Sequence, residues 1–83
     1  MKFNWRDIKR KHVESEAINS IGYDPEHRIL QIEFTSHDIY NYFAVPDYIH
    51  EEFMDAASKG TFFRQHILNQ YEYELMLHHK KAG

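Results

Sequence analysis

Apolar and polar side chains alternate within residues 28–35, and this alternation constrains the fold more than any other feature of the sequence. A period of two is typical of a β-strand with one buried face, formed here by Leu30, Ile32 and Phe34. Residues 17–23 and 39–45 also have strand character. Asp24-Pro25-Glu26 follows the first of these and suits a type I turn, because proline fixes φ at the second turn position. We therefore expect three strands in an antiparallel meander.

The length of the second turn decides which face of the sheet carries two tyrosines. With a three-residue loop, Phe34 lies opposite Tyr40. Ile32 then lies opposite Tyr42, and both tyrosines share the apolar face. A two-residue loop would pair Phe34 with Ile39 and turn both tyrosines outward, because side-chain direction reverses with each residue. The connection lacks the Asn-Gly or Gly-Gly pair typical of two-residue hairpins, so the longer loop is favoured.

Two helical segments follow the strands. Pro46 suits the start of the first helix, where its missing N–H costs nothing. The apolar side chains of that helix recur at helical spacing: Ile49, Phe53 and Ala56 or Ala57. Ser58 can cap a second helix that extends to Leu68, with an apolar stripe made of Phe62 or Phe63 and then Ile67. Residues 71–77 close the fold. The sequence predicts an α+β domain, a three-stranded antiparallel meander followed by two short helices packed on one face.

Length and composition are those of one small domain. The chain has 83 residues, and its 42% hydrophobic content is enough for a compact core. We expect the domain at residues 13–77, a basic N-terminal arm at 1–12 and a flexible tail at 78–83. The chain has no cysteine, which fits a reducing compartment. Its longest apolar run, residues 42–45, is far shorter than the roughly 20 residues of a membrane span. A cytoplasmic protein is therefore expected.

Charge is distributed unevenly along the chain. Residues 1–12 carry five basic side chains and one acid, whereas residues 13–58 carry ten acids and one arginine. Residues 59–83 carry four basic side chains and two acids, and the net charge of the whole chain is -3. Proteins that bind duplex DNA through its phosphates usually have a strong basic excess. Any nucleic-acid site in this chain must therefore be local and lie near the basic ends.

The sequence gives no positive sign of an enzyme. His50-Glu51 begins like a zinc-protease helix motif, but Met54 occupies the position of the second histidine ligand. The three glycines are too far apart to build a phosphate-binding loop. The four serines lack the context of a nucleophile elbow. No three histidines or carboxylates have metal-ligand spacing, so we expect neither a metal nor a cofactor.

An ordered set of motifs resembles the KTSC domain, a family named after the C-terminal domain of certain lysyl-tRNA synthetases. The family also occurs as free-standing small bacterial and phage proteins. The resemblance covers residues 13–73 and rests on these segments: Val13-Glu14-Ser15, Ile18, Ile21-Gly22-Tyr23-Asp24, Leu30-x-Ile32-x-Phe34, Tyr40-Asn41-Tyr42, Val45-Pro46, Ala57-Ser58-Lys59-Gly60-x-Phe62-Phe63, Ile67 and Tyr71-x-Tyr73. It implies a small α+β domain without an established biochemical role. RNA binding is proposed for the family from its attachment to a tRNA synthetase, which is an argument by analogy.

The chain departs from the family pattern at four places. Ser36-His37-Asp38 stands where relatives tend to have glycine, and Glu16 replaces a second serine. Glu72 stands between the last tyrosines where proline is usual, and it weakens a phosphate-binding interpretation. Arg64 replaces a common asparagine and partly restores that interpretation.

The candidate binding residues fall into two groups. Tyr40 and Tyr42 could stack on bases, an interaction worth about 1–3 kcal/mol per base. Ser58, Lys59 and Gly60 open the second helix, where free N–H groups, the helix dipole and a close backbone approach favour an anion, and Arg64 follows on the same helix. The structural alternative places both tyrosines over the core and makes Ser58 only a cap.

Three functions are compatible with these residues. A non-enzymatic module that binds RNA or single-stranded nucleic acid is favoured. The first alternative is a protein-interaction or assembly module, either a homo-oligomer or a phage accessory protein acting on a host factor. Its basis is the aromatic content and the acidic middle of the chain. The second alternative is a pocket for a free nucleotide at Lys59. Neither a membrane nor a metal is expected as a partner.

Overall fold

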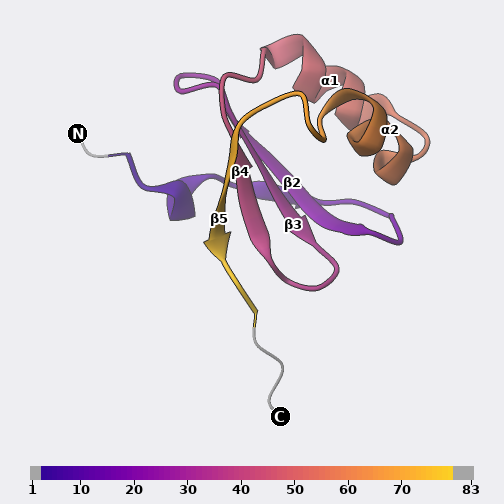
Figure 1. Cartoon of the computed structure of the whole chain (residues 1–83), viewed down its shortest axis with the longest axis horizontal. Coiled ribbons are helices and arrows are strands. Elements are labelled where there is room, and N and C mark those ends of the chain that lie inside the picture. The colour runs from indigo at the N-terminus through magenta and orange to yellow at the C-terminus, as the bar shows by residue number, and fades with distance from the viewer. Residues whose placement is uncertain (1–2, 80–83) are drawn as a thin grey trace.

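The alternating segment forms the central strand β3 (Ile29–Phe34) of a five-stranded antiparallel sheet in the computed structural model, which describes residues 3–79. The strands follow one another in chain order across the sheet: β1 (Arg10–His12), β2 (Ile18–Asp24), β3, β4 (Ile39–Tyr42) and β5 (Tyr73–Leu77). Figure 1 shows β2 to β5 side by side. The three predicted strands and the antiparallel meander are confirmed.

The predicted number of strands is wrong, because a further strand is added at each edge. β1 lies in the segment that we took for a basic arm, and its three residues are all polar, so no alternation marks them. β5 comes from the segment that closes the fold after the helices. Both are edge strands, which bury less surface and therefore carry a weaker sequence signal than β3.

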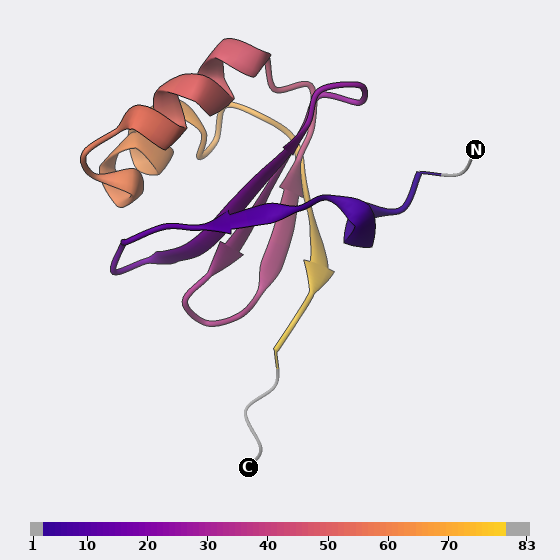
Figure 2. The ribbon, with the colours of Figure 1, turned by 180° about the vertical axis from the view of Figure 1, so that it is seen from behind.

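Two helices, α1 (Asp47–Asp55) and α2 (Lys59–His66), cover one face of the sheet as predicted (Figures 1 and 2). Pro46 precedes α1 with extended backbone (φ -64°, ψ 151°), so it is the N-cap and not the first helical residue. Ser58 caps α2 as expected, since its hydroxyl accepts a hydrogen bond from the Thr61 N–H at 3.2 Å. α2 ends two residues before the predicted Leu68. Neither described helix is long and apolar enough to cross a membrane.

The hydrophobic core lies between the helices and the sheet. Its fully buried members come from every layer: Ile18, Ile21, Leu30 and Ile32 from β2 and β3, Val45 from the connection to α1, Phe53 from α1, and Ile67 after α2. Phe63, and not Phe62, is the aromatic residue of α2 that is buried. The helical and strand periodicities of the sequence therefore converge on one core.

The turn between β3 and β4 has three residues, and both tyrosines lie on the apolar face, as favoured. The loop consists of residues 35–37, one position earlier than expected, because the Phe34 N–H donates to the Asp38 carbonyl at 3.0 Å. Tyr40 therefore lies opposite Ile32 and Tyr42 opposite Leu30, so the predicted partners were wrong. The face is unchanged because the partners move by two residues, and an even shift preserves side-chain direction.

The opposite face of the sheet carries the polar side chains of Gln31 and Asn41 beside the apolar Ile29 and Ile39, and it is partly covered by residues 3–9, which include a 3₁₀ turn at Trp5–Asp7 (Figure 2). Gln31 on β3 is fully buried there. Its amide donates to the Trp5 carbonyl at 3.0 Å and to the Asn41 side chain at 2.9 Å. Its side-chain oxygen accepts a hydrogen bond from Arg10 at 2.6 Å. These hydrogen bonds fix residues 5–10 on the sheet.

The predicted C-terminal tail begins with two residues that touch the sheet. The His79 N–H donates to the Asp38 carboxylate at 2.8 Å, and the His78 ring lies 3.2 Å from the same oxygen. The remainder of the predicted tail, 80–83, lies outside the described residues, as do residues 1 and 2.

Ala44 has a left-handed backbone with φ of 57° and an exposed side chain. This conformation costs a residue with a Cβ about 1–2 kcal/mol. We expect Ala44→Gly to raise the free energy of unfolding by about 0.5–1 kcal/mol, after the extra unfolded-chain entropy of glycine is subtracted. Urea unfolding measures this change. Ala56→Gly is the control. Ala56 has φ of -65°, which alanine adopts without strain, so this variant should be less stable than the original protein. Equal losses in both variants would contradict the prediction.

Candidate functional site

The two tyrosines of the predicted site differ in exposure, and a third ring joins them. Tyr42 is only 4% exposed and belongs to the core, whereas Tyr40 is half-buried. Burial, together with the neighbouring hydroxyls of Tyr40 and Tyr73, raises the pKa of Tyr42 far above its usual value. Tyr42 therefore offers no free face for base stacking. Tyr73, which was not among the candidate binding residues, lies 5.8 Å from each of the other two rings and is 59% exposed.

Four predicted residues do come together around one cleft. Ser58, Lys59, Gly60 and Arg64 line a cleft of about 250 Å³ between the start of α2 and the loop that joins β1 to β2. An added Cβ at Gly60 would lie 3.3 Å from the Arg64 guanidinium and 4.0 Å from Ala17, so a side chain at this position would occupy part of the cleft. None of the tyrosines lines it. The predicted site is thus divided into two separate places.

The charge of this cleft is balanced. Glu14 and Glu16 line it opposite Lys59 and Arg64, a pairing that the sequence analysis did not foresee. The Lys59 ammonium donates to the Ala56 carbonyl at the end of α1, so its position is fixed by that contact. Among the hydrogen bonds of residues 3–79, Arg64 makes a single long one, to the Thr61 hydroxyl at 3.4 Å. Its guanidinium is therefore the more available of the two cations.

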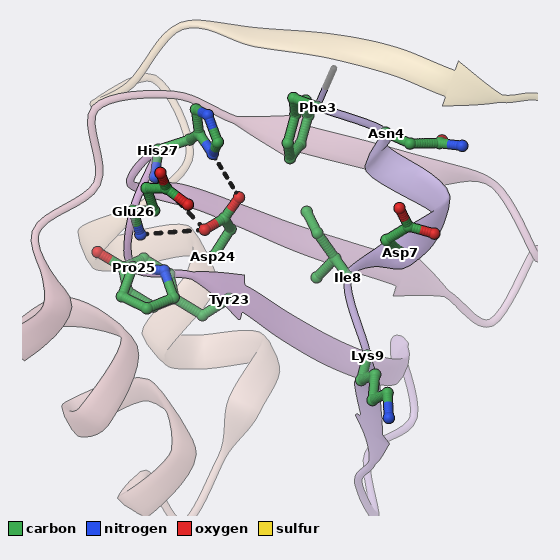
Figure 3. Close-up of a pocket in the computed structure, with 10 residues that line it drawn as sticks. All are labelled: Phe3, Asn4, Asp7, Ile8, Lys9, Tyr23, Asp24, Pro25, Glu26 and His27. Atoms are coloured by element: carbon green, nitrogen blue, oxygen red, sulfur yellow. Dashed lines mark hydrogen bonds and ion pairs between the residues drawn. The ribbon is translucent and has the colours of Figure 1, made fainter. Parts of the chain in front are cut away.

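A second and larger cleft, of about 500 Å³, lies between residues 3–9 and the turn after β2 (Figure 3). Asp24, Glu26 and His27 bring their ligand atoms within 4.8 Å of one another there, a spacing compatible with a divalent cation, although Glu26 and His27 are exposed. The Asp24 carboxylate already has hydrogen-bond partners. It accepts a hydrogen bond from the Glu26 N–H at 3.0 Å, and its other oxygen lies 2.7 Å from Nδ1 of the His27 ring. Partial burial opposes its ionisation, but these hydrogen bonds outweigh burial and lower the pKa of Asp24.

This second cleft was not predicted from the sequence. Residues 1–12 were expected to form an arm separate from the domain, whereas Phe3, Asp7 and Ile8 form one wall of the cleft. The Phe3 ring lies 4.7 Å from the His27 ring. Only the apolar residues of the arm, Phe3, Trp5 and Ile8, signalled in advance that it could pack against the domain.

Comparison with known proteins identifies the family. Residues 14–71 match the KTSC domain. The chain belongs to the KTSC domain family. Among solved structures, this KTSC domain is similar to a KTSC domain protein from Yersinia pestis, with a TM-score of 0.81 and 40% identity. That match covers 83% of this chain and 97% of the other. The expected family and its small α+β fold are therefore confirmed.

Sequence relatives of this KTSC domain are of two kinds. An uncharacterized protein of Stutzerimonas stutzeri is 41% identical over 58 residues, which cover 70% of this chain and 82% of that protein. A lysine–tRNA ligase of a Nostoc species is also 41% identical, over 61 residues. The match covers 74% of this chain but only 11% of the ligase, so the KTSC domain corresponds to a small part of that enzyme.

Proposed function

We propose that this KTSC domain is a non-enzymatic module that binds RNA or single-stranded nucleic acid at the α2 cleft. One observation carries the proposal, namely that Ser58, Lys59, Gly60 and Arg64 line a single cleft at the start of a helix. Helix N–H groups, two cations and a glycine that permits close approach are together suited to a phosphate group. The related segment in a lysine–tRNA ligase supports RNA as the polymer.

A phosphate of a polymer fits this cleft better than a free nucleotide. Pockets for small organic ligands usually measure about 300–1,000 Å³, and this cleft of about 250 Å³ is smaller. The exposed basic residues Lys9, Lys11 and His12 run along the β1 edge into the loop that forms the other wall of the cleft. They can contact further phosphates of an extended strand. Because Glu14 and Glu16 oppose the cations, the affinity should be weak and steeply dependent on salt.

Titration of the labelled protein with a short single-stranded RNA at two salt concentrations tests the proposal. We expect Lys59→Ala and Arg64→Ala each to weaken binding about fivefold and to reduce the slope of log affinity against log salt by about 0.7. Conversely, Glu14→Gln with Glu16→Gln should strengthen binding, because this pair opposes the cations. Gln65→Ala, at an exposed position of the same helix, is the control and should change nothing.

Changes in amide chemical shifts, followed by NMR in the same titration, locate the site. They should cluster at residues 14–17 and 58–64, which form the two walls of the cleft. Binding that is insensitive to salt and to all four charge substitutions would overturn the proposal. So would shifts confined to the second cleft around Asp24.

A further inference from the structure

Part of the apolar face of the sheet is open to solvent where β4 pairs with β5. Tyr73 lies opposite Tyr42 and Leu75 opposite Tyr40, so these four side chains share that face. Tyr42 is buried and Tyr40 half-buried, but Tyr73 is 59% exposed and Leu75 43% exposed. Residues 3–79 therefore leave most of the Tyr73 ring uncovered. We call the surface made of Tyr40, Tyr73 and Leu75 the tyrosine platform.

A run of contacting aromatic rings joins the tyrosine platform to α2. The ring centroids of Phe63 on α2 and Phe34 on β3 lie 5.3 Å apart. Those of Phe34 and Tyr40 lie 5.6 Å apart, and those of Tyr40 and Tyr73 lie 5.8 Å apart. The platform is thus the exposed end of an aromatic cluster whose other end packs beneath the second helix.

The same cluster adjoins both walls of the α2 cleft. On the helix wall, Phe63 directly precedes Arg64, which lines the cleft. On the loop wall, the carbonyl of Ala17 accepts a hydrogen bond at 3.0 Å from the N–H of Thr35, the residue after Phe34. The cleft and the tyrosine platform are therefore separate places on one continuous surface, which a short polymer can contact together.

From this continuity we propose that the tyrosine platform stacks unpaired bases of the same RNA strand whose phosphate lies in the α2 cleft. Because the strand is the one held at the cleft, this role rests on the proposed function. It adds the class of RNA, a single strand with accessible bases. A tyrosine ring can stack on any base, so the platform should have little sequence preference. The bases of a duplex are covered by their neighbours and cannot stack on the protein.

Charge assigns different parts of the nucleotide to the two places. The cations Lys59 and Arg64 lie at the cleft and suit a phosphate. The charged neighbours of Tyr73 in the chain are instead Glu72 and Glu74, and both are exposed. Their carboxylates repel a phosphate but not a neutral base. The platform is therefore suited to the bases and not to the backbone of the strand.

A second contact on the same strand also compensates for the weakness of the cleft. Glu14 and Glu16 oppose the two cations there, so one phosphate alone binds weakly. Once a phosphate is held, stacking of a nearby base is an intramolecular step with a high effective concentration. The two weak contacts together give a higher affinity than either gives alone.

Titration of the full chain with two strands of about eight nucleotides, a usual site size, tests this role. One is single-stranded oligouridine, and the other is a ribose-phosphate strand of the same length without bases. We expect Tyr73→Ala to weaken binding of oligouridine at least about fivefold. The slope of log affinity against log salt should not change, because no cation is removed. The same variant should bind the base-free strand as the original protein does.

Two further variants separate stacking from other effects of the substitution. Tyr73→Phe keeps the ring, so its affinity for oligouridine should stay within about twofold of the original value. Tyr48→Ala is the matched control, because Tyr48 is 55% exposed but lies on α1, and it should change nothing. Circular dichroism checks that each variant is folded. In NMR spectra, the ring resonances of Tyr73 should shift upfield with oligouridine and not with the base-free strand.

The outcomes distinguish failure of the stacking role from failure of the α2 cleft. If Tyr73→Ala binds oligouridine like the original protein while Arg64→Ala is weakened, stacking is wrong and the cleft remains. Equal losses for both strands would also overturn stacking, because the contact would then be with the backbone. If the original protein binds neither strand, the proposed function fails with it, and the tyrosine platform is left for a protein partner.

Discussion

Replacing Phe53 with alanine should lower the free energy of unfolding by about 3–5 kcal/mol, the usual loss for a fully buried phenylalanine. Phe53 is completely buried and joins the two helices, since its ring stacks on Phe62 with centroids 5.3 Å apart and planes 16° apart. Its carbonyl also accepts the Ala56 N–H that ends α1. The substitution therefore removes core surface and the contact that positions the start of α2.

Urea unfolding followed by circular dichroism measures this loss. Tyr48→Ala on the same helix is the control, because Tyr48 is exposed, and its loss should stay within about 0.5 kcal/mol. RNA affinity measured at a temperature where the Phe53→Ala variant is still folded should also fall, since Lys59 is positioned by the Ala56 carbonyl. A loss below about 1.5 kcal/mol would mean that the core collapses around the cavity, and would contradict the tight packing described above.

Gly22→Ala should destabilise the protein by about 2–3 kcal/mol through overpacking. An added Cβ at Gly22 would lie 2.8 Å from the Lys9 carbonyl oxygen and 2.8 Å from the Ile8 side chain. This carbonyl is backbone that directly precedes β1, and Arg10 lies opposite Gly22, so the carbonyl cannot move aside without displacing the start of β1. We therefore expect β1 and the residues before it to detach while the helices and β3 stay packed.

Amide hydrogen exchange tests the second part of this prediction. Protection should be lost at residues 10–12 in the Gly22→Ala variant and retained at the centre of β3. Gly60→Ala is the matched control, because its new Cβ would lie 3.3 Å from the flexible end of Arg64 and 4.0 Å from Ala17, an ordinary van der Waals distance. That change should leave stability unchanged or raise it by up to about 1 kcal/mol, since alanine is the better helix former. Equal losses in the two variants would show that the strand contact is not the cause.

Local signals in the sequence were enough for the central part of the fold. The alternation through Leu30 and Ile32 predicted β3, the spacing of Ile49 and Phe53 predicted α1, and Ser58 predicted the cap of α2. Each of these signals depends on residues close in the chain. The edge strands were missed because an edge strand buries little, so Arg10-Lys11-His12 carries no pattern that separates it from a loop.

The candidate site was less predictable, because its properties depend on distant segments. Ser58, Lys59 and Gly60 are neighbours in the chain, so their grouping followed from the sequence. Whether Glu14 and Glu16 lie across the cleft from Lys59 and Arg64 depends on how the β1–β2 loop packs against α2, which follows about 45 residues later in the chain. The exposure of Tyr40 and Tyr42 depended on the register of one turn, which a single-residue change would have reversed.

The polar contact between residues 3–12 and the sheet has a consequence for native-state motion. Within those residues only Ile8 buries an apolar side chain, and the other anchors are hydrogen bonds from Gln31 and Arg10. Water can replace such bonds at little net cost, whereas it cannot replace buried apolar contacts. This segment should therefore open subglobally at a lower free energy than the helices and the central strands. Its opening exposes the polar side chain of Gln31 and lets the chain release its most basic segment toward a polyanion.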